Sequence, residues 1–303
     1  MRSVLFLLLV SILLNPVLTW CQNSSVFEVQ ANQGAVRPSD ITKAIRKVCP
    51  EEAINGTDEG GAIGCAECPP GTAMQGEKGF DWELKHVTLG HFISPTSDTL
   101  LLSGSGCEPH SLSFGGTFVF ALELGKARLL DYREGLITEG CQKLPLRDDR
   151  DFLVCEDRWG AQGYEASYVC GVVFDSTGKG TVQAIFEADD NVRTCGADVD
   201  GNFLGPVHHS SIKAVRFRNV DGPSPLEMSV TVALGKRVLT RAESNECQKR
   251  IGNPGFRDTI VPVPTKDYQV QFLFDDKRFS VAPASRAIEK LFPKPEYPLG
   301  ITD

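Results

Sequence analysis

"TFVFALEL", residues 117–124, and "MSVTVAL", residues 228–234, decide the fold class of this chain. In each segment large apolar side chains alternate with other residues: Phe118, Phe120, Leu122 and Leu124 in the first, and Met228, Val230, Val232 and Leu234 in the second. Alternation with a period of two places one face of an extended segment in a core and the other in water. Both segments are therefore predicted to be β-strands.

Eight more segments have a similar length and composition, and Gly, Asp, Asn or Pro separates them. They are "VTLGHF" (87–92), "TLLLSG" (99–104), "ARLLDY" (127–132), "DFLVCE" (151–156), "YVCGVVF" (168–174), "TVQAIF" (181–186), "IKAVRF" (212–217) and "YQVQFLF" (268–274). A weak repeat with a period on the order of 50 residues starts at Asp98 and again at Asp151. We expect a mainly β fold, built either as a propeller or as layers of antiparallel β repeats.

Two short helices flank the predicted strands. "ITKAIRKV" (41–48) has apolar residues at helical spacing, with Ser39 or Asp40 as the cap and Pro50 at the end. A second helix is expected from Pro283 to Leu291, capped by Ser285. Residues 51–80 are rich in Gly, Pro and acidic side chains, which indicates a loop.

The first twenty residues resemble a secretory leader in their layout. Arg2 precedes a long apolar run that Asn15 and Pro16 interrupt, and the run is shorter than the roughly 20 residues that a spanning helix needs. We therefore expect residues 1–20 to be a signal peptide, with a lipid anchor on Cys21 as the alternative. The rest divides into a polar arm, short helix and cysteine-containing loop (21–80) and a β domain (81–303). The expected location is outside the cytosol: secreted, periplasmic or at the cell surface.

The chain has ten cysteines, at positions 21, 49, 65, 68, 107, 141, 155, 170, 195 and 247. In an exported chain these are expected to form disulfides. In a reducing compartment Cys65 and Cys68, with Cys49 and either His86 or His91, would instead suit zinc. Cys155 and Cys170 fall on adjacent predicted strands and could face one another. If Cys21 leaves with the signal peptide, nine cysteines remain and one is unpaired.

The net charge of −8 argues against nucleic acid and anionic membranes as partners. No segment after residue 21 is apolar enough for stable insertion into a membrane. The expected partner is an unidentified protein or small ligand outside the cell.

One loop, "RNVDGPSPLEM" (218–228), gathers oxygen-bearing side chains around a glycine. Asn219, Asp221 and Glu227 could supply up to four oxygens to Ca²⁺. Alternatively the loop is a turn in which the Asn and Asp side chains bond their own backbone. Calcium is the one cofactor that the sequence suggests. "DVDGN" (198–202) opens with the spacing of a calcium loop, but no acidic residue closes it, so a turn is expected there.

"LGHFISPTSDTLLLSG" (89–104) and "FRNVDGPSPLEMSVTV" (217–232) resemble FG-GAP repeats, the blades of integrin-α-like β-propellers. The resemblance implies calcium ligands at Asn219, Asp221, Pro223 and Glu227, of which Pro223 offers no side-chain oxygen. The matching positions of the first copy, His91, Ile93, Pro95 and Thr99, cannot build such a site.

Three groups of residues have side chains used in catalysis. Glu108, His110 and Ser111 lie in one predicted loop, but the segment lacks a nucleophile elbow. Glu187, Asp189 and Asp190 could act as paired carboxylates on a glycoside, or could be solvated turn residues. His208 and His209 could chelate one metal only from a loop, because neighbours on a strand face opposite ways. We expect them instead to be exposed to solvent on the loop "GPVHHSS".

The sequence favours an exported, disulfide-bonded β-repeat protein with a binding or structural role and no catalytic activity. The alternative is a secreted hydrolase that uses Asp or Glu on a propeller-like scaffold. A hydrolase should gather several acids and a histidine in one hollow with a shifted carboxylate. A binding protein should instead present an exposed apolar or aromatic patch.

Overall fold

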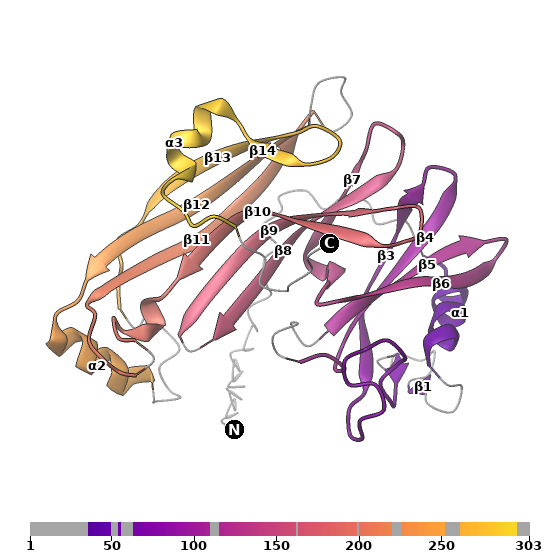
Figure 1. Cartoon of the computed structure of the whole chain (residues 1–303), viewed down its shortest axis with the longest axis horizontal. Helices are drawn as coiled ribbons and strands as arrows, with labels where there is room; N and C mark the ends of the chain where they lie inside the picture. The colour runs from indigo at the N-terminus through magenta and orange to yellow at the C-terminus, as the bar shows by residue number, and fades with distance from the viewer. Residues whose placement is uncertain are drawn as a thin grey trace, which may run out of the picture.

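The computed structural model describes residues 36–49, 54–55, 63–109, 115–161, 163–198, 200–219, 226–251 and 261–295. This part of the chain is mainly β and forms three antiparallel sheets (Figure 1). The first sheet contains β1 (Ile54–Asn55), β2 (Gly64–Cys65), β3 (Trp82–Ser94), β4 (Ser97–Ser105), β5 (Gly115–Glu123) and β6 (Lys126–Glu134), in that order. The second has the order β10 (Gly180–Asp190), β9 (Tyr164–Phe174), β8 (Asp151–Ala161) and β7 (Cys141–Pro145). The third has the order β11 (Pro206–Arg218), β12 (Leu226–Val238), β13 (Lys266–Phe274) and β14 (Phe279–Val281).

The second sheet is buried on both faces, because alternate side chains of its strands enter two different cores. On β8, Phe152 and Val154 pack with β12, β13 and β14 of the third sheet. Leu153, between them, packs against Leu101 and Val119 of the first sheet. Each fully buried side chain of this kind contributes about 1.5–3 kcal/mol to folding. The second sheet therefore lies between the first and the third.

The first sheet is also covered on its outer side. Leu100 and Phe118 point away from the second sheet and pack with Ile45 of α1 (Pro38–Val48). Figure 1 shows α1 on this outer side and α2 (Arg241–Ile251) at the far end of the molecule. The helix and the cysteine loop that follows it thus share a core with the β-strands.

All ten predicted strands are confirmed as parts of β3–β6 and β8–β13. The sheets stack as layers, and a propeller is not confirmed. Leu124 was expected on the apolar face of its strand but is fully exposed, because it occupies the β5–β6 turn with a φ of 49°. Short strands such as β7 and β14 were not predicted, since five and three residues show too little alternation.

The two predicted helices exist but begin differently. The N-cap of α1 is Arg37, followed by Pro38 in the first turn, where its missing N–H costs nothing. Asp40 is not the cap; its buried carboxylate pairs with Arg37 at 2.8 Å and Lys43 at 3.3 Å. At the other end a 3₁₀ turn (Pro283–Ser285) leads into α3 (Arg286–Glu289). Ser285 is the N-cap residue of α3, as predicted, but its hydroxyl accepts a bond from the Gln271 backbone amide and makes no capping bond to the helix.

The helix α2 was not predicted, although the sequence contains its start signal. The Thr240 hydroxyl accepts a bond from the Glu243 amide (3.2 Å), and the Glu243 carboxylate accepts one from the Thr240 amide (2.8 Å). This reciprocal pair is a capping box, the T-x-x-E pattern. Its residues are so polar that no apolar periodicity marked the helix. In the described part of the chain no helix is long and apolar enough to cross a membrane.

Four disulfides confirm the expected use of cysteine: Cys49–Cys65, Cys68–Cys107, Cys141–Cys155 and Cys195–Cys247. Such bonds persist in an oxidising, extracellular type of environment. They also consume the thiols of the alternative zinc site. Cys170 is unpaired and buried, whereas Cys21 lies outside the described residues.

The suggested contact between Cys155 and Cys170 exists, but the bond forms elsewhere. Cys155 on β8 lies opposite Cys170 on β9 and also opposite Cys141 on β7. A strand residue forms a hydrogen-bonded pair with one neighbour and a closer, non-hydrogen-bonded pair with the other. The Cα atoms of Cys141 and Cys155 are only 3.9 Å apart, so the disulfide joins these two.

Candidate ligand-binding site

One hollow opens between the second and third sheets, where β8 begins and β9 ends. We call it the aromatic hollow; its volume is about 400 Å³, within the range of ligand pockets. The residues that line it are Arg150, Phe152, Gly171, Val173, Phe174, Asp175, Thr181, Gln183, Phe274, Asp276, Lys277 and Phe279.

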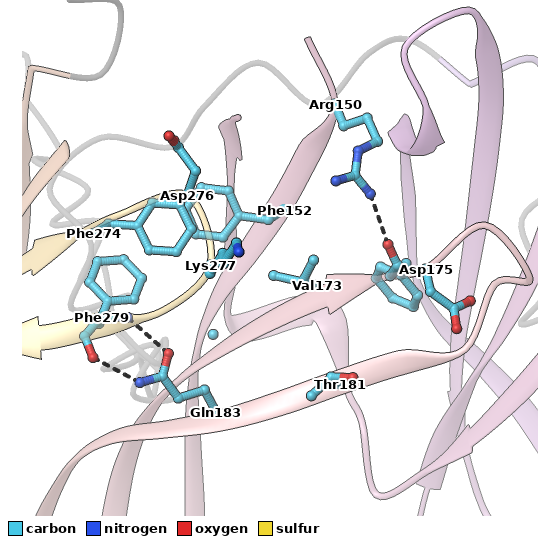
Figure 2. A pocket seen from close by; sticks show the side chains of 12 residues that line it. Arg150, Phe152, Val173, Asp175, Thr181, Gln183, Phe274, Asp276, Lys277 and Phe279 are labelled. Carbon is cyan, nitrogen blue, oxygen red and sulfur yellow. Dashed lines mark hydrogen bonds between the residues drawn. The ribbon is translucent and has the colours of Figure 1, made fainter. Parts of the chain in front are cut away.

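Three phenylalanine rings form one wall of the aromatic hollow (Figure 2). Phe152 stacks on Phe274 with the ring centroids 4.6 Å apart, and Phe279 lies 4.7 Å from Phe274. Each ring is almost fully buried. They come from β8, β13 and β14, so the wall exists only because the sheets pack face to face. Rings held in this way offer an apolar surface to a flat or aliphatic group.

Gln183 joins the two sheets beside this wall. Its side-chain amide donates to the Phe279 carbonyl and accepts from the Phe279 amide, both at 2.9 Å (Figure 2). The Gln183 side chain thus makes the backbone hydrogen bonds that a neighbouring strand would otherwise make with the edge strand β14. These two bonds fix the backbone of Phe279, whose ring is part of the aromatic wall.

Most of the charged groups that line the aromatic hollow already have a hydrogen-bond or ion-pair partner within the protein. Arg150 donates to the Phe174 carbonyl (3.1 Å) and pairs with Asp148, a neighbour in sequence. Asp276 pairs with Arg147 at 3.1 Å. Asp175 accepts three bonds within its own turn, and the hydrogen bond from the Thr177 hydroxyl in particular lowers the pKa of its carboxyl.

Lys277 is different, because none of the described residues forms an ion pair with its amino group. Lys277 is exposed on the β13–β14 turn, and Figure 2 shows it next to the aromatic wall. The aromatic hollow therefore combines an apolar wall with one available cation.

A second hollow of about 340 Å³ lies at the opposite ends of β8, β9 and β10, where β11 begins. We call it the polar hollow. The residues that line it are Arg158, Trp159, Gly160, Glu165, Ala166, Ser167, Ala188, Asp190, His209, Ser210, Ser211 and Ile212.

Two adjacent histidine–aspartate pairs connect β10 to β11 beside the polar hollow. His208 Nε2 lies 2.5 Å from Asp189, and His209 Nδ1 contacts Asp190. The expectation of exposed loop histidines was wrong: both lie partly buried on β11, and Asp189 and Asp190 at the end of β10 contact them. Burial raises the pKa of Asp189, but the hydrogen bond and charge of His208 lower it more, so the carboxyl titrates below its usual range.

The predicted calcium loop is described only at its ends. Asn219 has a φ of 58°, a left-handed conformation that Asn tolerates in turns, and Asp221 lies outside the described residues. Glu227 is exposed on β12, directly opposite Arg218 on β11. Among the residues that the structure describes, no three or more His, Cys, Asp or Glu gather where they could hold a metal ion. Calcium binding by Asn219, Asp221 and Glu227 stays a prediction.

The "DVDGN" segment behaves as the expected turn. The Asp198 carboxylate accepts bonds from the backbone and side-chain amides of Asn202, at 2.7 and 2.9 Å. Its oxygens thus stabilise the turn itself.

Glu108 is buried away from both hollows. Its carboxylate accepts bonds from the Ala73 amide (3.1 Å) and the Tyr132 hydroxyl (2.8 Å). Burial raises the pKa of Glu108 in spite of these bonds, and burial beside Glu108 also raises the pKa of Tyr132. His110 and Ser111 lie outside the described residues. The structure thus brings Glu108 no catalytic partner among the residues that it describes.

Neither hollow could be inferred from the sequence. Each is assembled from ends of several strands, and the residues that meet are far apart in the chain. Comparison of the chain with protein-family models, with curated proteins and with solved structures found no match.

Proposed function

We propose that this protein is an exported, disulfide-bonded binding protein that holds a small amphipathic anion in the aromatic hollow. The observation that carries the proposal is the wall of Phe152, Phe274 and Phe279 beside the amino group of Lys277, which has no ion pair with any described residue. The rings favour an aromatic or aliphatic body, and the lysine favours a carboxylate or sulfonate.

The arrangement of charge supports an anion rather than a cation. Asp175 is engaged by its own turn and Asp276 by Arg147, so neither needs a ligand. A ligand anion would give Lys277 its only ion pair among the described residues and would also approach Arg150 at the same hollow. An exposed ion pair contributes at most about 1 kcal/mol, so most of the affinity has to come from burial of the ligand's own apolar body in the hollow.

The alternative of a secreted hydrolase has weaker support. The polar hollow does combine a histidine with Asp190 and Glu165. However, the pKa of the neighbouring Asp189 is lowered, and Glu108, whose pKa is raised, lines neither hollow. An acid catalyst near neutral pH needs the opposite shift at the site itself.

Two fluorescent probes that differ by one charged group test the proposal. Anilinonaphthalene sulfonate and N-phenylnaphthylamine share their rings, and only the first carries a sulfonate. We expect both to bind at a single saturable site. Lys277→Ala should weaken the sulfonate roughly fivefold, equivalent to about 1 kcal/mol, and leave the neutral probe unchanged.

Two further variants locate the site. Val173→Phe should weaken both probes, because the larger ring occupies the hollow that Val173 lines. Lys249→Ala, an exposed lysine on α2, is the matched control and should change neither. Binding that is indifferent to both Lys277→Ala and Val173→Phe would refute the proposal.

A further inference from the structure

We propose that the polar hollow is a second binding site, for a small neutral saccharide. It lies at the opposite ends of β8–β10 from the aromatic hollow and shares no lining residue with it. The inference is therefore independent of the function proposed above. Its volume of about 340 Å³ is near the lower limit of ligand pockets, which suits a small ligand.

The charges around the polar hollow are balanced. Both Nε and Nη2 of Arg158 donate to Glu156, at 3.1 and 2.9 Å. Glu165 pairs with Arg193 at 3.6 Å, and His209 pairs with Asp190. A charged ligand would compete with these existing partners, whereas a neutral ligand would not.

The polar hollow offers hydrogen-bond donors and acceptors side by side. His209 contacts Asp190 through Nδ1, so Nε2 is the ring atom that can serve a ligand. The Ser211 hydroxyl is buried and has no hydrogen-bond partner among the described residues. An unsatisfied buried hydroxyl costs about 1–3 kcal/mol, so a ligand that satisfies it is favoured. Saccharide hydroxyls, which both donate and accept, match this mixture.

Trp159 adds an apolar ring to the same hollow. It is partly buried on β8, next to Arg158 and Gly160. Trp82, by contrast, packs in the core beneath α1 and lines neither hollow. An indole face suits the C–H face of a sugar ring while the polar groups take its hydroxyls. The geometry thus pairs one apolar surface with a polar rim.

The test uses glucose and N-acetylglucosamine as neutral probes, with glucuronate and glucosamine as their charged counterparts. Saturation-transfer NMR should show contact with the neutral probes and at least tenfold weaker contact with the charged ones. The fluorescence of Trp159 should change as the neutral probes bind. No transfer to either neutral probe, or tighter binding of a charged probe, would overturn the inference.

Variants distinguish binding of the sugar probes in the polar hollow from nonspecific contact with the protein surface. Ser211→Ala and Trp159→Ala should each weaken binding at least threefold, and Trp159→Phe should retain binding because it keeps a ring. Ser280→Ala, an exposed serine on β14, is the control and should have no effect. If Trp159→Ala fails to fold, Ser211→Ala decides the matter, since the loss of one oxygen leaves the packing intact. Binding unchanged in Ser211→Ala would overturn the assignment.

Discussion

Replacing Cys141 by alanine should move a disulfide instead of removing it. Cys141, Cys155 and Cys170 lie opposite one another on the consecutive strands β7, β8 and β9. Without Cys141, the thiol of Cys155 is left beside that of Cys170. Directly opposed Cα atoms in an antiparallel sheet are about 4.5–5.5 Å apart, a distance that a disulfide spans. We therefore expect Cys141→Ala to contain a Cys155–Cys170 bond.

The expected stability follows from the lengths of the closed loops. The native bond joins residues 14 apart, which corresponds to about 3 kcal/mol in the chain-entropy relation. The new bond would join residues 15 apart, so its contribution is nearly the same. The double variant Cys141→Ala/Cys170→Ala cannot form either bond and should lose the full amount. At roughly 2 °C per kcal/mol for a chain of this size, its Tm should fall about 6 °C below that of the single variant.

Two measurements check this expectation. Thiols are alkylated in denaturant without reduction and located by peptide mass spectrometry, and Tm is measured for each variant. Cys170→Ala alone controls for lost packing at the buried position of Cys170. The reasoning is refuted if Cys141→Ala shows alkylated thiols at both Cys155 and Cys170 and melts together with the double variant.

Three further outcomes are expected. Burial raises the pKa of Glu108 above its usual value of 4.5, so the folded protein retains a proton that the unfolded chain releases, and stability falls as pH rises above 4.5. Urea unfolding of Glu108→Gln should lack this decline, whereas the exposed control Glu123→Gln should keep it. Thr240→Ala should cost about 1 kcal/mol in urea unfolding through loss of the α2 cap, and an unchanged midpoint would contradict the capping box. If the loop at 219–227 binds Ca²⁺, calcium at 100 times its Kd should stabilise the protein by about 2.7 kcal/mol, and a Tm unmoved by chelator would disprove it.

The strands could be predicted from sequence because each carries its own signal. Phe118 and Phe120, or Val230 and Val232, reveal an apolar face without reference to any other part of the chain. The layered order could not be predicted. It depends on which face of β8 meets which sheet, and the alternation of Phe152 and Leu153 is equally compatible with either choice.

The hollows could not be predicted, because they join distant residues. Phe152 and Phe274 stack although more than a hundred residues separate them, and nothing in either segment marks the other. The histidine–aspartate pairs could be inferred more readily from the sequence than the hollows. β10 and β11 are consecutive strands, and His208 and His209 near the start of β11 contact Asp189 and Asp190 at the end of β10. These pairs were not predicted, because His208 and His209 were assigned to a loop and not to a strand.

The four disulfides have a consequence for how this protein bears mechanical load. Each links elements within one layer: two in the first, one in the second and one beside the third. The described contacts between layers are non-covalent: apolar cores, and polar contacts such as those of Gln183 with Phe279 and of Asp190 with His209. Pulled from its ends, the oxidised chain should part at these interfaces into three tethered blocks, and the segments closed by sulfur should add no length to the extension.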